Sequence, residues 1–123
     1  MSAARLALKL LLALVFVVAG VNHFVSEAFY LRMMPPYLPA HRLLVFWSGV
    51  AEVALGLLLL IPRFTRLSAW GLIALLVAVF PANMQMALNP ALFPEFSPAV
   101  LWLRLPLQAV LVFWAHWFTR PRD

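Results

Sequence analysis

Four long apolar stretches, separated by short segments that carry most of the prolines and charges, dominate the chain. They cover residues 6–24, 43–61, 67–88 and 99–118. A run of about 18 or more apolar residues with few charges is typical of a helix that crosses a lipid bilayer. The pattern therefore predicts an all-α polytopic membrane protein, a four-transmembrane-helix bundle in a single domain of residues 1–123.

The first apolar stretch has a second interpretation as a signal peptide, since Val17 and Ala19 loosely fit a cleavage site. A membrane span is favoured because the run is long. The segments that follow it are also hydrophobic and do not resemble a soluble domain.

The first break, residues 26–41, contains the run MPPYLP at residues 34–39. Three prolines remove backbone donors and restrict φ, so this run cannot form a regular helix. The segment is nevertheless apolar. It is expected to form a structured cap at the membrane interface, with Tyr37 as an aromatic anchor.

The later breaks constrain how the helices connect. The loop at 62–66 is short, which predicts that the second and third spans are antiparallel neighbours. Pro81 inside the third span removes a hydrogen-bond donor and predicts a kink. Residues 89–98 form a proline-rich connection to the fourth span.

Composition supports lipid as the main solvent. Of the 123 residues, 66% are hydrophobic and 11% are charged, whereas soluble domains have about 45–50% apolar and about 25% charged residues. The chain has no cysteine. It therefore cannot supply dithiol chemistry or cysteine ligands for zinc, iron–sulfur clusters or haem.

The basic residues predict an orientation. The net charge of +5 resides mainly next to the apolar spans, which points to membrane topology and lipid phosphates rather than nucleic acid. With four spans, one side carries six basic residues and the other carries Arg32, Arg42 and, slightly inside its helix, Arg104. This predicts cytoplasmic termini and a multi-pass protein of the bacterial inner (plasma) membrane. The six are Arg5, Lys9, Arg63, Arg66, Arg120 and Arg122.

Glu52 and Arg104 lie inside spans that should otherwise be buried in lipid. A charge at that depth costs a few kcal/mol and is normally paired, hydrated or functional. Since they lie on different helices at similar depth, the sequence predicts an intramembrane ion pair between them. Two roles stay open for the pair, a structural one that sets helix register and a ligand-binding or proton-handling one.

Other polar residues fall in the same outer half of the predicted bundle, while the inner half has almost none. Asn22 lies near the end of the first span, and Ser48 stands one turn before Glu52. Gly20, Gly49 and Gly56 share faces with these residues and would allow close helix packing. No two histidines form an i, i+4 pair, so no metal site is predicted. The candidate ligand-binding residues are His23, Tyr37, Glu52, Asn83, Arg104 and Gln108, and no catalytic residue is assigned.

Several segments resemble the DoxX-like family of small bacterial membrane proteins, over about residues 6–118. The matching segments are NHF at 22–24, MPPYLP at 34–39, SG at 48–49, PAN at 81–83 and RLPLQ at 104–108. The resemblance implies four membrane helices. Relatives include a subunit named for thiosulfate:quinone oxidoreductase, a methylamine-utilisation membrane component and a chaperone for acetylcholine receptors, so it does not decide between redox and assembly roles.

Two main functions are compatible with these observations. In the first, the chain is a non-catalytic accessory subunit of a membrane redox complex that binds a quinone or another lipid-soluble molecule, with electrons supplied by a partner protein. In the second, it is a non-enzymatic assembly, chaperone or scaffolding protein. A transporter would need a polar path through the apolar inner half, which only a homo-oligomer could provide. Membrane lipid is a partner in every case.

Overall fold

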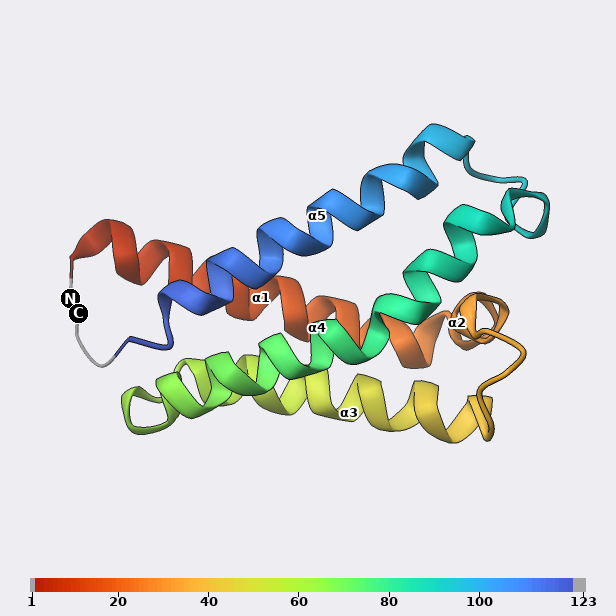
Figure 1. Ribbon diagram of the computed structural model, residues 1–123. Helices are drawn as coiled ribbons and strands as arrows, with labels where there is room; N and C mark the ends of the chain where they lie inside the picture. The colour runs from red at the N-terminus through yellow and green to blue at the C-terminus, as the bar shows by residue number, and fades with distance from the viewer. Residues whose placement is uncertain (1, 121–123) are drawn as a thin grey trace.

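The computed structural model describes residues 2–120 as an all-helical chain (Figure 1). Its four long helices are α1 (Ala3–Val25), α3 (His41–Leu59), α4 (Thr65–Leu88) and α5 (Pro98–Trp117). By length and composition, four helical segments are apolar enough to cross a membrane. The four predicted spans are thus confirmed as helices, with ends that differ by a few residues.

The helix ends follow local chemistry. The Ser2 side chain accepts a hydrogen bond from the backbone N–H of Arg5, which caps α1. Ser97 caps α5 in the same way, and Pro98 occupies the first turn, where no donor is needed. A short 3-10 helix, η1 (Pro62–Phe64), makes the tight turn between α3 and α4.

The first break contains a helix that the sequence analysis missed, α2 (Glu27–Met33). It begins directly after Ser26, where α1 ends, with Glu27 in its first turn. Residues 34–39 are non-helical, as the prolines predict. Ala40, with φ 50°, turns the chain into α3. The second connection holds another 3-10 helix, η2 (Pro90–Leu92).

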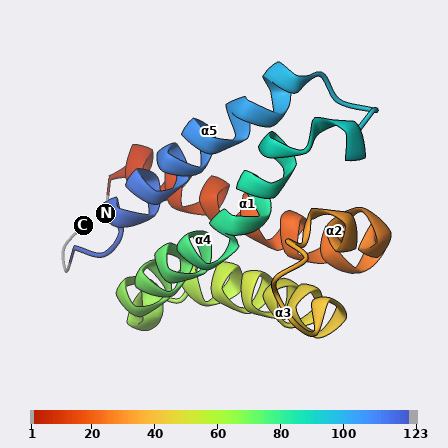
Figure 2. The ribbon, with the colours of Figure 1, turned by 45° about the vertical axis from the view of Figure 1, so that its right-hand side comes forward.

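Helix α4 lies between α3 and α5, with α1 packed on α3 (Figures 1 and 2). The contact of α1 with α3 is close because glycines meet there. A methyl group on Gly49 would lie 2.8 Å from Cβ of His23 and 3.1 Å from the carbonyl oxygen of Gly20. The predicted role of these glycines in close packing is confirmed.

Pro81 lies inside α4, and the helix continues through it. Figure 1 shows α4 changing direction in its second half, where the colour passes from green to teal. The missing N–H leaves the carbonyl of Val77 without its helical donor, which accounts for the predicted bend.

Two apolar cores hold the helices together. The larger one joins α1, α3, α4 and α5 through residues such as Leu12, Phe16 and Leu72. The smaller one joins α2, the end of α4, the second connection and the start of α5 through Met33, Met86, Phe93 and Leu101.

Candidate functional site: a polar pocket between the helices

A pocket of about 300 Å³ lies between the helices. Apolar side chains form most of its lining, and Met33, Met34 and Leu38 from the first break contribute to it. With Tyr30, four lining residues therefore come from the predicted cap, residues 26–41. Its polar lining residues are His23, Tyr30, Ser48, Glu52, Asn83 and Arg104.

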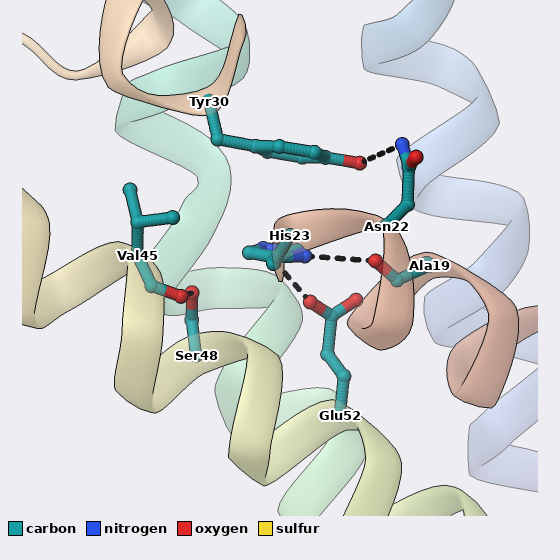
Figure 3. A network of polar contacts seen from close by, with 7 residues as sticks. All are labelled: Ala19, Asn22, His23, Tyr30, Val45, Ser48 and Glu52. Carbon is teal, nitrogen blue, oxygen red and sulfur yellow. Dashed lines mark hydrogen bonds and ion pairs between the residues drawn. The ribbon is translucent and has the colours of Figure 1, made fainter. Parts of the chain in front are cut away.

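The first wall of the pocket centres on His23 of α1 and Glu52 of α3 (Figure 3). Nε2 of His23 lies 3.0 Å from Oε2 of Glu52. Nδ1 of His23 lies 2.8 Å from the carbonyl oxygen of Ala19. A carbonyl oxygen can only accept, so Nδ1 carries a proton and Nε2 faces the carboxyl group. A proton on either Nε2 or Glu52 would make this contact attractive.

Glu52 lacks a full set of hydrogen-bond partners. Its Oε2 atom is buried, and the contact with His23 lacks the geometry of a regular hydrogen bond. No residue within 2–120 donates a hydrogen bond to this oxygen. A buried carboxyl group without a full set of partners favours the approach of another polar group.

Tyr30 of α2 stacks on the His23 ring, with centroids 4.1 Å apart and planes 16° from parallel (Figure 3). Its hydroxyl oxygen accepts a hydrogen bond of 2.9 Å from Nδ2 of Asn22. Tyr30 is not among the predicted site residues, because residues 26–41 were expected to form an interfacial cap with Tyr37 as its aromatic anchor. The run of helix-forming residues after Ser26 was the signal available for α2, and through it for Tyr30.

The second wall is a chain of hydrogen bonds between α4 and α5. Nε of Arg104 donates to Oδ1 of Asn83 at 3.3 Å, and Nδ2 of Asn83 donates to Oε1 of Gln108 at 2.6 Å. Gln108 in turn donates to the carbonyl oxygen of Leu76 at 2.6 Å, one residue before the carbonyl that Pro81 leaves without a donor. This chain orients the Arg104 guanidinium at the pocket.

The predicted ion pair between Glu52 and Arg104 is wrong. Both residues line the pocket, but within residues 2–120 the ion-pair partner of Glu52 is His23, and Arg104 bonds Asn83. The reason is the helix arrangement. Helix α1 packs directly on α3, whereas α4 lies between α3 and α5.

Two predicted site residues lie elsewhere. Gln108 is buried beside the pocket and supports Asn83 without lining it. Tyr37 is 73% exposed in the first break and does not line the pocket. The expectation of an almost apolar inner half also needs correction. Thr65 and Ser68 are buried there and donate to carbonyl oxygens of α3.

Within residues 2–120, no group of three or more histidine, aspartate or glutamate side chains could hold a metal ion. The pocket offers hydrogen-bond donors and a contact between an imidazole and a carboxyl group. A guanidinium stands on one side and a carboxyl–imidazole pair on the other, both amid apolar side chains.

Comparison with known proteins gives one family and no individual relative. No curated protein and no solved structure matches the chain. Residues 12–119 match a family described as a domain of unknown function. This match covers nearly all of the chain, and the protein therefore belongs to the DUF8561 family.

Proposed function

We propose that this protein binds a quinone-like, lipid-soluble molecule in the pocket and serves as an accessory subunit of a membrane redox complex. The observation that carries the proposal is that Glu52 and Arg104 line one pocket without pairing with each other. Their polar groups are available to a ligand placed between them.

The pocket chemistry suits a ring with two carbonyl oxygens. Only Nε of Arg104 has a partner among the described residues, so its terminal nitrogens can donate to one ligand oxygen. A proton on Nε2 of His23 or on Glu52 can be donated to the other. The guanidinium and the carboxyl–imidazole pair would thus bind opposite ends of the ring.

The size of the pocket limits what enters it. Ligand pockets span about 300–1,000 Å³, and this one is at the small end. It would hold a ring and leave an apolar tail in the lipid. Reduction of a quinone needs two electrons and two protons. We place the electron source on a partner protein, while the His23–Glu52 pair exchanges protons with the ligand.

We further propose that the four long helices form a bundle in the bacterial inner membrane with both termini in the cytoplasm. Arg5, Lys9, Arg63, Arg66 and Arg120 gather at one end of the molecule. At the other end Arg32 and Arg42 each face a glutamate. An excess of basic residues marks the cytoplasmic side. Reporter fusions at each terminus and at residue 37 test this orientation.

Native mass spectrometry of the protein, gently extracted from its own membrane, tests the ligand proposal. We expect a bound quinone in the wild type and none in Glu52→Gln or Arg104→Ala. Matched controls are Glu27→Gln and Arg42→Ala, which remove the same charges from an exposed pair whose nearest atoms are 3.9 Å apart. Retention of the quinone in both pocket variants would contradict the proposal.

The alternative is a non-enzymatic assembly or scaffolding role. Tyr37 in the first break is mostly exposed and offers an aromatic contact outside the pocket. If a partner protein co-purifies without any small molecule and Tyr37→Ala releases it, the assembly role is the better description. The resemblance to DoxX-like proteins is compatible with both roles.

A further inference from the structure

A second pocket, separate from the one described above, lies at the end of the molecule where α1 begins and α4 begins. Its volume is about 400 Å³. Basic side chains from α1, η1, α4 and the segment after α5 line it, so residues distant in sequence meet there. The five are Arg5, Lys9, Arg63, Arg66 and Arg120.

Lys9 is the residue that most needs a ligand. It is only 3% exposed, and it makes no hydrogen bond or ion pair with any residue in 2–120. Its ammonium nitrogen keeps some access to the pocket, since it is not one of the fully buried unpartnered atoms of the described residues. An anion in the pocket would give this nitrogen a partner in a mostly apolar setting.

The described acidic residues do not supply this anion. Glu27 faces Arg42, Glu52 contacts His23 and Glu95 pairs with Arg32. All three lie away from the residues that line this pocket. Lys9, Arg63 and Arg66 therefore have no carboxylate counter-ion among the described residues.

The neighbouring residues indicate what kind of anion fits. Leu6, Leu10 and Leu60 also line the pocket, and each is more than a third exposed. An anionic group bound by Lys9 would thus have apolar surface directly beside it. This combination suits a molecule with a phosphate head and an apolar chain. The N-terminal end of α4, at Thr65, adds the positive end of a helix dipole.

We propose that this pocket binds the phosphate group of an anionic amphiphile, with Lys9, Arg63 and Arg66 around the phosphate and the acyl chains along Leu6, Leu10 and Leu60. Guanidinium groups match phosphate oxygens well and stay charged. Arg66 is already oriented by its Nε, which donates to the carbonyl oxygen of Thr119 at 3.0 Å. The site is independent of the quinone-like ligand proposed above.

The test is titration of the delipidated protein in detergent with dioleoyl phosphatidylglycerol, read by native mass spectrometry. We expect one tightly bound lipid per chain. Lys9→Met and Arg63→Gln should each weaken binding about tenfold, because each removes a charge-assisted hydrogen bond. Arg42→Gln, which removes an exposed charge at the opposite end, should leave binding unchanged.

A second experiment, which measures the melting temperature, distinguishes a lipid phosphate from free inorganic phosphate as the ligand. If inorganic phosphate alone raises the melting temperature as much as the lipid does, and Lys9→Met abolishes both effects, the phosphate site stands with a soluble ligand. If Lys9→Met and Arg63→Gln bind the lipid like the wild type, or Arg42→Gln weakens it equally, the proposal is overturned. Arg63 is exposed, so Arg63→Gln should fold even if Lys9→Met does not. The lipid affinity of Arg63→Gln then tests the proposal.

Discussion

His23 on α1 places Nε2 3.0 Å from Oε2 of Glu52 on α3, and each side chain is 10% exposed. The contact lies next to the glycines at which the two helix backbones meet. It therefore links the close contact of α1 with α3 to the pocket, and changes to it are expected to affect both stability and the ligand binding proposed above.

Removing only one partner of this pair should be strongly destabilising. His23→Leu leaves Glu52 buried without its neighbour, which is expected to cost about 3–5 kcal/mol of unfolding free energy. The double variant His23→Leu with Glu52→Met should recover most of this loss, because no buried polar group is then left unpaired. Reversible denaturation in detergent measures the unfolding free energy of the single and the double variant. Equal loss in the double variant would show that the two residues do not act together.

The glycine contact between α1 and α3 should tolerate no added methyl group. In Gly49→Ala the new carbon would meet His23 Cβ and the Gly20 carbonyl oxygen, neither of which can rotate away. We expect a loss of about 1–3 kcal/mol. Gly71→Ala is the matched control. There the neighbour is the flexible end of Leu55, and the variant should be neutral or gain up to about 1 kcal/mol in helix propensity. Thermal unfolding of both variants tests this difference.

Substitutions at Gln108 and Arg104 should have different effects: the first should mainly lower stability, and the second should mainly lower ligand binding. Gln108→Leu leaves Nδ2 of Asn83 without its acceptor and removes the side-chain donor to the carbonyl of Leu76, which is expected to cost about 1–3 kcal/mol. Arg104→Gln loses a single 3.3 Å bond and should change stability less, yet abolish quinone binding. Denaturation and ligand retention, measured on the same preparations, check this. Full ligand retention in Arg104→Gln would contradict the role given to Arg104.

The ion pair of Arg32 with Glu95 should make the packing of α2 depend on pH. Arg32 also donates to the carbonyl of Leu92 at 3.0 Å, which joins α2 to the second connection. Hydrogen bonding from Arg32 lowers the pKa of Glu95 below its ordinary value of 4.5. A lowered pKa in the folded state stabilises the fold above the unfolded-state pKa, and the benefit is lost as pH falls through the folded-state pKa.

Hydrogen exchange of residues 26–33 and 90–96 measures this effect. Protection should be constant from pH 7 to about pH 5 and should fall below the ordinary pKa of 4.5, after correction for intrinsic exchange. Glu95→Gln should show weaker protection at neutral pH and no further loss on acidification. Glu27→Gln is the control and should keep the wild-type pH dependence.

The local sequence was sufficient to predict the four long helices, their approximate ends and four of the polar residues that line the pocket. A long apolar run that enters lipid can satisfy its backbone groups only as a helix, so the four runs are enough to predict four long helices. Polar residues such as His23, Glu52, Asn83 and Arg104 are expected to avoid lipid, which agrees with their place together around the pocket. Tyr30 was not predicted because a seven-residue helix just before the prolines has no clear periodic signal.

Only the tertiary structure decided which polar groups meet. Charge and depth alone favoured Glu52 with Arg104, but pairing depends on which helices are neighbours. The glycine contact packs α1 on α3, which places His23 next to Glu52. Helix α4 lies between α3 and α5, which separates Glu52 from Arg104. The same packing brings Lys9 beside Arg63 and Arg66, more than fifty residues away in sequence. Helix neighbours are set by contacts between distant residues, and no local pattern along the chain contains that information.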